Sequence, residues 1–559
     1  MSTIKEKTIQ LIDELKAVCQ QKGLGNDGNE YKIITQVFLY KFLVDKFGYE
    51  LKKLPQAAAI KNAGEKWEDA FSSMSEKDRN LLVQFLPADV PSLKPEWLIS
   101  SLWNQQAKGE IDVIFDETMV AIANANLDIF HTLAADAQGN KQKLPIFERL
   151  TQYVTNEADR APFARALLDK LNKFSFEETF TEHYDFFSDI FEYMIKDYNT
   201  AGGGKYAEYY TPKSIARVMA RLLVGDNPNL VSQECYDPSA GTGTLLMALS
   251  HQIGERKTTI YAQDISQRSN KMLRLNLLLN GLVSSLDYAI QGDTLVAPYH
   301  KSDDGKQLRQ FDFVVSNPPF KMDFSDTRDD IESRWGTSRF WAGIPKVPAK
   351  DKTSMAVYTC FIQHVINSIK EGGKGAIVVP TGFITAKSGI ESKILKHIVD
   401  NRLVMGVVSM PSNVFANTGT NVSVLFFDKS ARKSVDDKVI LMDASKLGTE
   451  GKDANGLKKT FLSPDDIEQI VSTFREKKAV DDFSVVVSYK EIEEKGYSLS
   501  AGQYFDIKID YVDITEEEFN LQMKADTDEL KAMFEESHKL EKTIMEQLGI
   551  LKFDTNIND

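Results

Sequence analysis

The stretch with the most specific chemistry in this chain is Asn317-Pro318-Pro319-Phe320. Proline lacks a backbone N–H and holds φ at about −65°, so this turn is stiff and its carbonyl oxygens stay available as acceptors. Asn317 adds a side-chain carbonyl oxygen, and Phe320 adds a flat aromatic face. Two fixed acceptors beside an aromatic ring suit a planar heterocycle that carries an exocyclic amino group. A strand that merely ends in a proline-rich turn has the same pattern, so the neighbouring elements must discriminate.

Four short apolar segments, each followed by a polar side chain, are expected to position this chemistry. The apolar run 311–315 predicts a buried strand directly before Asn317. Three earlier strands are predicted to end at or just before Asp237, Asp264 and Asp293. In an open α/β sheet the carboxyl ends of such strands share one crevice. An Asp after a strand is also a common helix N-cap, but four such ends in succession favour one shared site.

The segment after Asp237 predicts a strand–turn–helix site for a nucleotide-like ligand. Its turn reads Gly241-Thr242-Gly243-Thr244, and a helix is expected from about Thr244. The third glycine of the dinucleotide fingerprint is missing, and the Gly-Lys-Ser/Thr of a phosphate loop does not follow. Asp237 would repel a pyrophosphate and attract a cationic ligand. Asp264 follows the glycines by about 20 residues, where such sheets place an acid on ribose hydroxyls. Asp293 could accept from an adenine amino group.

A glycine-rich segment precedes these strands. The run 200–213 reads Thr-Ala-Gly-Gly-Gly-Lys-Tyr-Ala-Glu-Tyr-Tyr-Thr-Pro-Lys. We expect a flexible loop over its glycines, then a helix to about Leu223 that is capped by Thr211 and has Pro212 in its first turn. A glycine-rich loop before a helix N-terminus can hold an anion or a carboxylate, although many linkers have this composition.

The flanks of the chain predict helices. Before residue 160, helical spacing of apolar residues covers 4–20, 31–52, 65–85 and 116–132, and 140–145 is expected to be a loop. This region has no catalytic constellation and predicts a helical bundle. A charged helix over 515–548 carries a partial heptad stripe, which could pack on its own domain or dock a partner helix.

Two further expectations concern the region after the Asn-Pro-Pro turn. The segment 321–354 interleaves basic and aromatic residues, including Arg328, Arg339 and Phe340, which is typical of a loop that faces DNA. Its acids nearly cancel this charge, so an ordinary mobile insertion is the alternative. We expect the sheet to be complete at Phe427.

Composition limits the class of protein. At 559 residues the chain should contain more than one domain. Its three cysteines are far apart and its seven histidines lack zinc-site spacing, so we expect a reducing compartment and no metal. The N-terminus lacks a signal-peptide pattern and no apolar run could span a bilayer, so we expect a cytoplasmic protein without membrane contact. The net charge of −14 argues against a wholly nucleic-acid-binding surface, but it permits a local basic cleft or a partner that supplies positive charge.

Taken in order, these motifs resemble the amino-group DNA methyltransferases that use S-adenosylmethionine. With its helical flanks, the chain resembles the modification subunit of type I restriction–modification systems over most of its length. Asp264 stands where glutamate is expected in many relatives, and Thr244 where a second glycine is common, but both keep the needed chemistry. The matching segments are Thr211-Pro212, Asp237 to Thr244, Gln263-Asp264, Gly292-Asp293, Asn317 to Phe320, 375–382 and 407–427.

The resemblance implies a fold of class α/β. A Rossmann-like S-adenosylmethionine-dependent methyltransferase sheet (166–480) would lie between an N-terminal α-helical domain (1–165) and a C-terminal helical tail that docks a partner (481–559). Phe415 is implied as a second plate against the base, although a core aromatic before a turn would look the same. The implied catalytic residues are Asn317, Pro318, Pro319 and Phe320. The implied cofactor-binding residues are Glu208, Tyr209, Tyr210, Thr211, Pro212, Lys213, Asp237, Gly241, Thr242, Gly243, Thr244, Asp264 and Asp293.

The implied reaction is methyl transfer from S-adenosylmethionine to N6 of an adenine that has flipped out of double-stranded DNA. Asn317 Oδ1 and the Pro318 carbonyl would accept the two hydrogens of the amino group. A separate specificity subunit would read the target, with two modification subunits for each specificity subunit. A restriction nuclease subunit is a further implied partner.

Three other functions remain open. A stand-alone DNA adenine methyltransferase would read DNA through its own N- or C-terminal region. A protein glutamine methyltransferase shares the Asn-Pro-Pro turn, but such enzymes usually have Tyr at the position of Phe320 and lack large helical flanks. A scaffold with a dead site is the non-enzymatic alternative, against which the intact motif set argues.

Overall fold

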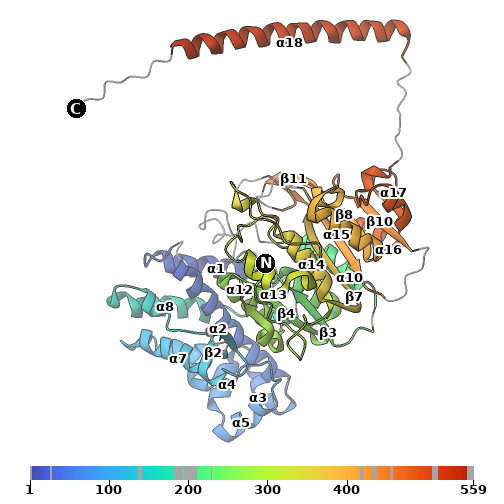
Figure 1. The fold of residues 1–559 in the computed structure, drawn as a ribbon. Coiled ribbons are helices and arrows are strands. Elements are labelled where there is room, and N and C mark those ends of the chain that lie inside the picture. The colour runs from blue at the N-terminus through green and yellow to red at the C-terminus, as the bar shows by residue number, and fades with distance from the viewer. Residues whose placement is uncertain are drawn as a thin grey trace. The chain divides into compact units, whose positions relative to one another are not determined.

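The computed structural model contains two compact units, Met1–Phe505 and Asp506–Asp559. The larger unit combines N-terminal helices with a sheet covered by helices, and one long helix dominates the smaller unit (Figure 1). Within the described residues, no helix has both the length and the apolar character needed to cross a bilayer. The structure describes residues 3–25, 28–135, 141–181, 190, 193, 211–227, 229–415, 421–430, 437–452, 458–505 and 514–550.

The N-terminal region is helical, as its apolar spacing predicts. The first helix begins after a capping box, in which Glu6 N donates to Thr3 Oγ1 over 3.2 Å and Thr3 N donates to Glu6 Oε2 over 2.8 Å. The expected helix over 65–85 is interrupted, and the loop expected over 140–145 is wrong, because this segment pairs as a strand. The elements are α1 (Ile4–Gln20), α2 (Gly28–Lys53), α3 (Ala58–Ala63), α4 (Trp67–Ser73), α5 (Glu76–Gln84), α6 (Ile99–Asn104), α7 (Ile111–Ala125), β1 (His131–Ala135), β2 (Lys141–Pro145) and α8 (Glu157–Asn172).

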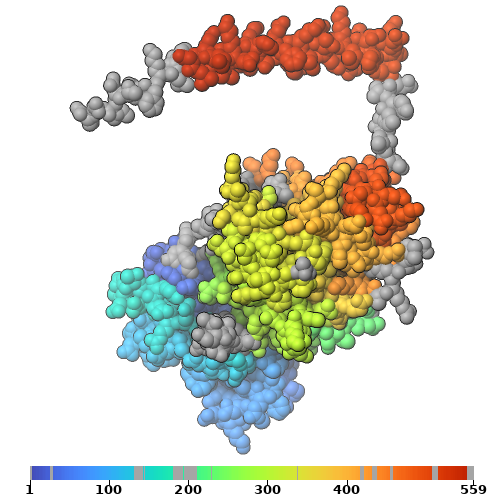
Figure 2. Space-filling model, viewed as in Figure 1, coloured from blue at the N-terminus to red at the C-terminus, as the bar shows by residue number. Residues whose placement is uncertain are grey.

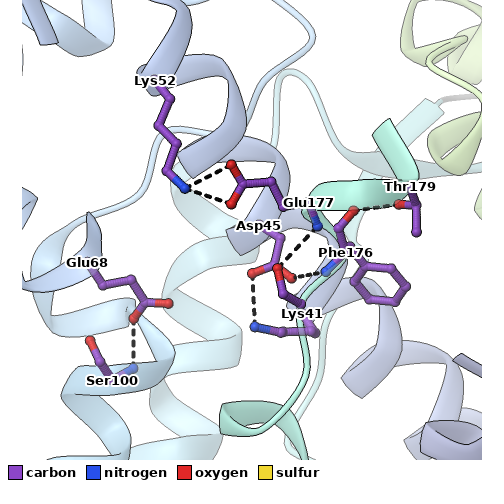
Figure 3. A network of polar contacts seen from close by, with 9 residues as sticks. Lys41, Asp45, Lys52, Glu68, Ser100, Phe176, Glu177 and Thr179 are labelled. Atoms are coloured by element: carbon purple, nitrogen blue, oxygen red, sulfur yellow. Dashed lines mark hydrogen bonds and ion pairs between the residues drawn. The ribbon is translucent and has the colours of Figure 1, made fainter. Parts of the chain in front are cut away.

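A buried ion pair on α2 fixes the chain that leaves α8 (Figure 3). Lys41 Nζ lies 2.9 Å from Asp45 Oδ1, and Asp45 Oδ2 accepts from Phe176 N over 2.7 Å. About two turns further along α2, Lys52 Nζ pairs with Glu177 over 2.6 Å. Burial raises the pKa of Asp45, against the lowering effect of Lys41 and of the Phe176 N–H. The segment that leads toward the glycine-rich run is thereby held against α2.

A nine-stranded sheet forms the centre of the larger unit. Its order is β13-β10-β8-β9-β7-β6-β3-β4-β5. The run from β7 to β5 is parallel, and β9 pairs antiparallel with both β7 and β8. The strands are β3 (Gln233–Asp237), β4 (Thr258–Asp264), β5 (Ala289–Gln291), β6 (Phe311–Ser316), β7 (Ile369–Pro380), β8 (Val404–Ser409), β9 (Val422–Asp428), β10 (Lys438–Asp443) and β13 (Ser484–Ser488).

Helices cover both faces of this sheet. Consecutive strand residues point to opposite faces, so each face contributes to its own core. Cys235 and Phe313 belong to a core shared with α10 (Lys213–Val224), α11 (Thr244–Ile253) and α12 (Gln267–Leu279). Their neighbours Tyr236 and Val314 belong to a second core, shared with α14 (Tyr358–Ser368) and α15 (Gly389–Asp400). The predicted α/β class with an N-terminal helical part is confirmed.

The sheet continues past Phe427, so the expectation that it ends there is wrong. Strand β10 pairs with β8, and β13 pairs with β10 on the outer edge. The compact unit that contains the sheet runs to Phe505, whereas we expected the catalytic domain to end at residue 480 and the tail to cover 481–559. Between these strands lie a hairpin, β11 (Thr449–Lys452) with β12 (Lys458–Phe461), and the helix α16 (Pro464–Glu476).

The smaller unit contains the helix α18 (Glu516–Ile550) of 35 residues. Its start is capped by Thr515, whose Oγ1 accepts from Glu518 N over 3.3 Å. Large apolar side chains along the helix, which is red in Figure 2, are exposed, namely Phe519, Leu521, Met523, Leu530, Met533, Phe534, Leu540, Ile544, Met545 and Leu548.

Candidate active site

The four predicted strand ends lie along one edge of the sheet. Strands β6, β3, β4 and β5 are neighbours in that order and run parallel, so their carboxyl ends face the same way. Asp237 and Asp264 end β3 and β4, while Asp293 and Asn317 follow β5 and β6. The topology therefore brings together the residues that the sequence placed in one crevice.

The glycine turn after β3 depends on both of its glycines. Gly241 and Gly243 have positive φ values of 52° and 87°, which side chains with a Cβ rarely adopt. A Cβ on Gly243 would also collide with Leu273 Cδ1 on α12. Gly243 N donates to Ala240 O over 2.8 Å, which closes the turn, and Asn276 Nδ2 donates to Thr242 O over 3.1 Å. The turn is thus packed directly against α12.

Asp264 braces this turn. Its Oδ2 accepts from Gly241 N over 2.8 Å, and its Oδ1 accepts from Ser266 N over 2.8 Å. Burial raises the pKa of Asp264, while the two amides act in the opposite direction. Each carboxylate oxygen has a further lone pair, so a ribose contact remains compatible with this bracing and stays a prediction.

Asp237 is a buried carboxyl group, with 1% of its surface exposed. Its Oδ1 accepts from Ser239 N over 2.9 Å and from Ser239 Oγ over 3.3 Å. Burial, together with the nearby charge of Asp264, raises the pKa of Asp237 to about 8. A buried acid next to another acid favours a positively charged ligand, because a cation would offset both the desolvation and the repulsion.

The Asn-Pro-Pro turn lies against both earlier loops. Asn317 Nδ2 donates to Thr211 Oγ1 over 3.0 Å. The preceding residue, Ser316, places its Oγ 2.6 Å from Ser239 Oγ in the loop that carries the glycines. Thr211 does not cap α10 as we expected, because this helix begins at Lys213 with Pro212 in the cap position. The threonine hydroxyl is used by Asn317 instead.

The residues around the turn differ in exposure. Pro318 is buried, whereas Pro319 and Phe320 are half-buried. The Phe320 ring meets the edge of Tyr358, with 6.3 Å between ring centroids. Phe415 is 6% exposed and packs in the core, as the core-aromatic alternative expects, so a stacking role for it stays a prediction.

The loop after β5 is held from two sides. Asp293 Oδ1 accepts from Leu295 N over 2.8 Å and from Val296 N over 3.2 Å. From the other side, the Arg339 guanidinium donates to Thr294 O over 2.9 Å and to Leu295 O over 2.8 Å. A single arginine therefore fixes the backbone that directly follows Asp293.

Arg339 also connects this loop to the tip of β3. Its Nε donates to His364 Nδ1 over 3.0 Å, and His364 Nε2 lies 3.1 Å from the Tyr236 hydroxyl. Because the guanidinium can only donate, His364 carries its proton on Nε2 and donates to Tyr236. Arg339 is 2% exposed and Phe340 is buried, so the expectation that these two residues face DNA is wrong. Within a stretch of mixed charge, no sequence signal distinguishes a buried arginine from an exposed one.

Some predicted residues cannot be placed. Glu208, Tyr209 and Tyr210 lie outside the described residues. In the part of the chain that the structure describes, no group of three or more His, Cys, Asp or Glu could hold a metal ion.

Comparison with known proteins identifies the family. The N-6 DNA Methylase family matches residues 182–511, which include every strand of the sheet. The chain belongs to this family. The chain is 29% identical over 350 residues to the MpnII methylase subunit of a type I restriction enzyme from Mycoplasma pneumoniae, covering 61% of this chain and 60% of that one. It is 27% identical over 403 residues to the MjaIX methylase subunit of a type I restriction enzyme from Methanocaldococcus jannaschii, covering 68% and 66%. The chain thus spans 60% and 66% of the length of these two relatives.

Solved structures agree with the fold. The methyltransferase subunit of a type I restriction–modification system from Streptococcus thermophilus superposes with a TM-score of 0.67 at 19% identity, covering 90% of this chain and 99% of that chain. A modification subunit of a putative type I restriction enzyme from Vibrio vulnificus gives 0.53 at 18% identity, covering 88% and 94%. The predicted resemblance to type I modification subunits is confirmed.

Proposed function

We propose that this methylase is the modification subunit of a type I restriction–modification system and transfers a methyl group from S-adenosylmethionine to N6 of adenine in DNA. The observation that carries the proposal is the meeting of two loops. Ser316 contacts Ser239 over 2.6 Å, so the Asn-Pro-Pro turn lies beside the glycine turn. A group held by one turn can therefore react with a group held by the other. Family membership supports the same reaction.

The residues at the sheet edge fit S-adenosylmethionine. When bound, this cofactor supplies a methyl group on a positively charged sulfur. Asp237 is buried beside another acid, and the cationic methionine end would stabilise its ionised form. The glycine turn lets the ligand approach the backbone, Asp264 would accept from the ribose, and Asp293 from the adenine amino group. Thr211, Pro212 and Lys213, with the preceding residues 208–210, would close over the methionine end.

The Asn-Pro-Pro turn would act on the adenine amino group. The N6 lone pair is delocalised into the ring and is a poor nucleophile. Asn317 Oδ1 and Pro318 O would accept its two hydrogens, which favours a tetrahedral nitrogen with its lone pair directed at the methyl group. The nitrogen–carbon bond forms as the carbon–sulfur bond breaks, and N6 then releases one proton. Donation from Asn317 Nδ2 to Thr211 supports this role, because it directs Oδ1 away from Thr211.

An adenine inside a duplex cannot reach such a turn, so the base must flip out of the helical stack. The half-buried Phe320, whose ring packs T-shaped against Tyr358, would offer the base an aromatic face. Phe415 would need to leave its core position to act as a second plate.

Partners complete the proposal. A specificity subunit would read the double-stranded DNA target, with two modification subunits for each specificity subunit, and a restriction nuclease subunit would join this complex. The exposed apolar side chains of α18 support docking of the C-terminal helix to a partner helix. A cytoplasmic location follows from access to cellular DNA.

A methyl-transfer assay with radiolabelled S-adenosylmethionine tests this function. The full chain is assayed on DNA and on protein, with and without a co-expressed specificity subunit. We expect cofactor binding by the chain alone and site-specific DNA methylation only with the specificity subunit. Site-specific methylation by the isolated chain would indicate a stand-alone enzyme, and labelled protein would indicate a glutamine methyltransferase.

A further inference from the structure

A basic groove lies next to the candidate active site. It has a volume of about 280 Å³ and is formed by the start of α10, the loop after β8 and the β12 strand with the residues that follow it. Lys213, Arg217 and Lys459 line it, and the described residues around it include no Asp or Glu. In a chain with a net charge of −14, three cations around one groove indicate an anionic ligand.

The groove lies next in sequence to the residue that contacts Asn317. Pro212 lines it and directly follows Thr211, which accepts from Asn317 Nδ2 over 3.0 Å. Val414, at the other wall, directly precedes Phe415. A flipped base stays attached to its sugar, so the phosphates on both sides of that sugar must lie close to the pocket that receives the base.

The hairpin that carries Lys459 is fixed to the loop after β8. Thr460 N donates to Asn413 O over 3.1 Å, and Thr460 Oγ1 donates to Ser412 O over 2.7 Å. Two nearby acids of α16 have partners elsewhere: Asp466 accepts from Ser463 in the helix cap, and Glu468 pairs with Arg221. Asp465, next to Pro464, is exposed and does not line the groove. Lys459 is therefore held at the groove by an anchored strand.

Two features of the groove suit a nucleic-acid strand rather than an isolated anion. Arg217 and Lys213 are four residues apart on α10 and share one face of that helix. Phe461 is 46% exposed, and Lys459 Nζ lies 5.4 Å from its ring centroid. A cation next to an exposed aromatic ring is the combination that binds an unpaired strand, through phosphate and base together.

We propose that this groove holds the sugar–phosphate backbone of the strand that carries the flipped adenine, with Arg217 and Lys459 on its phosphates. Lys213, which the sequence placed with the cofactor residues, would contribute to the same groove. The inference rests on the proposed DNA methylation and adds to it a site for the target strand.

The test uses the full chain with its co-expressed specificity subunit and a fluorescent target duplex. Arg217→Ala and Lys459→Ala are compared with Lys458→Ala, which is exposed on the same hairpin but does not line the groove. We expect each groove variant to bind DNA more weakly and to lower the slope of log K against log salt by about 1. Affinity for S-adenosylmethionine and the melting temperature should match wild type, and Lys459→Arg should restore DNA binding.

Groove variants with the DNA affinity and salt slope of Lys458→Ala would overturn the inference. A second outcome would also overturn the inference: a groove variant separates from the specificity subunit on gel filtration, while the variant chain keeps its own affinity for DNA. The groove would then be a binding site for the specificity subunit. Methylation by the wild-type complex is scored separately. If the wild type binds DNA but does not methylate it, the proposed function fails, while the ratio of variant to wild-type binding still decides the groove.

Discussion

Asn317 donates from its side-chain nitrogen to the hydroxyl of Thr211 over 3.0 Å. A carboxamide has one donating and one accepting end, and in this bond the donating nitrogen faces Thr211. The accepting oxygen is directed to the other side, where the proposed adenine amino group would lie. Thr211 therefore holds the side chain that carries the proposed chemistry, in addition to its expected place near the cofactor.

Thr211→Val should lower kcat for DNA methylation by about tenfold to a hundredfold, because the Asn317 amide loses the acceptor that orients it. Thr211→Ser keeps a hydroxyl and should retain most of the activity. Steady-state kinetics with the specificity subunit measures the effect, and equilibrium binding of S-adenosylmethionine measures the smaller loss at the cofactor. Equal kcat values for Thr211→Val and Thr211→Ser would show that the Thr211 hydroxyl does not orient Asn317.

The raised pKa of Asp237, about 8, predicts opposite effects of pH on binding and on stability. The ionised carboxylate attracts the cationic cofactor, so affinity should increase as pH rises from about 6.5 to 8.5. The unfolded carboxyl has a pKa of about 3.9, so the stability that this group contributes is complete below that pH and is lost as pH rises through about 8.

Asp237→Asn is the control for both effects. It should bind the cofactor weakly, and its thermal midpoint should fall less than that of the wild type between pH 6 and pH 9. The α-amino group of the ligand also titrates at about pH 8, so the difference between wild type and variant is the informative quantity. Parallel pH profiles of the two proteins would contradict the account of Asp237.

Arg339→Met should destabilise the full chain by about 2–5 kcal/mol, since it leaves the Thr294 and Leu295 carbonyls without their buried donor. It should also raise the KM for S-adenosylmethionine, because those carbonyls follow Asp293. Arg334→Met, at an exposed position of the same segment (α13, Arg328–Arg339), should change stability by less than about 0.5 kcal/mol. Urea unfolding and initial rates measure these effects, and an unchanged KM would leave Arg339 a purely structural residue.

The sequence predicted which strand ends form the site, because the carboxyl ends of parallel strands lie at the same edge of a sheet. Short apolar runs identify β3, β4, β5 and β6, and the helices α11 and α12 between the first three favour a parallel order. Their carboxyl ends, with Asp237, Asp264, Asp293 and Asn317, then share an edge without any knowledge of tertiary contacts.

Contacts between distant segments could not be predicted in this way. Arg339 lies in an insertion of mixed charge, yet its guanidinium is buried against backbone carbonyls that any residue type would supply. The Thr211 hydroxyl has two equivalent uses in sequence terms, as a helix cap or as an acceptor, and only tertiary structure selects between them. Strands β10 and β13 are separated along the chain by a hairpin and the helix α16, so the pattern of each strand alone does not show which sheet it extends.

Replacement of Asn317 by Ala tests the central claim most directly. Methyl transfer from labelled S-adenosylmethionine to target DNA is measured for the variant and the wild type, each assembled with the specificity subunit, alongside cofactor binding. The account predicts that Asn317→Ala binds the cofactor as the wild type does and transfers no detectable methyl group. Wild-type methylation by this variant would contradict the assigned role of the Asn-Pro-Pro turn.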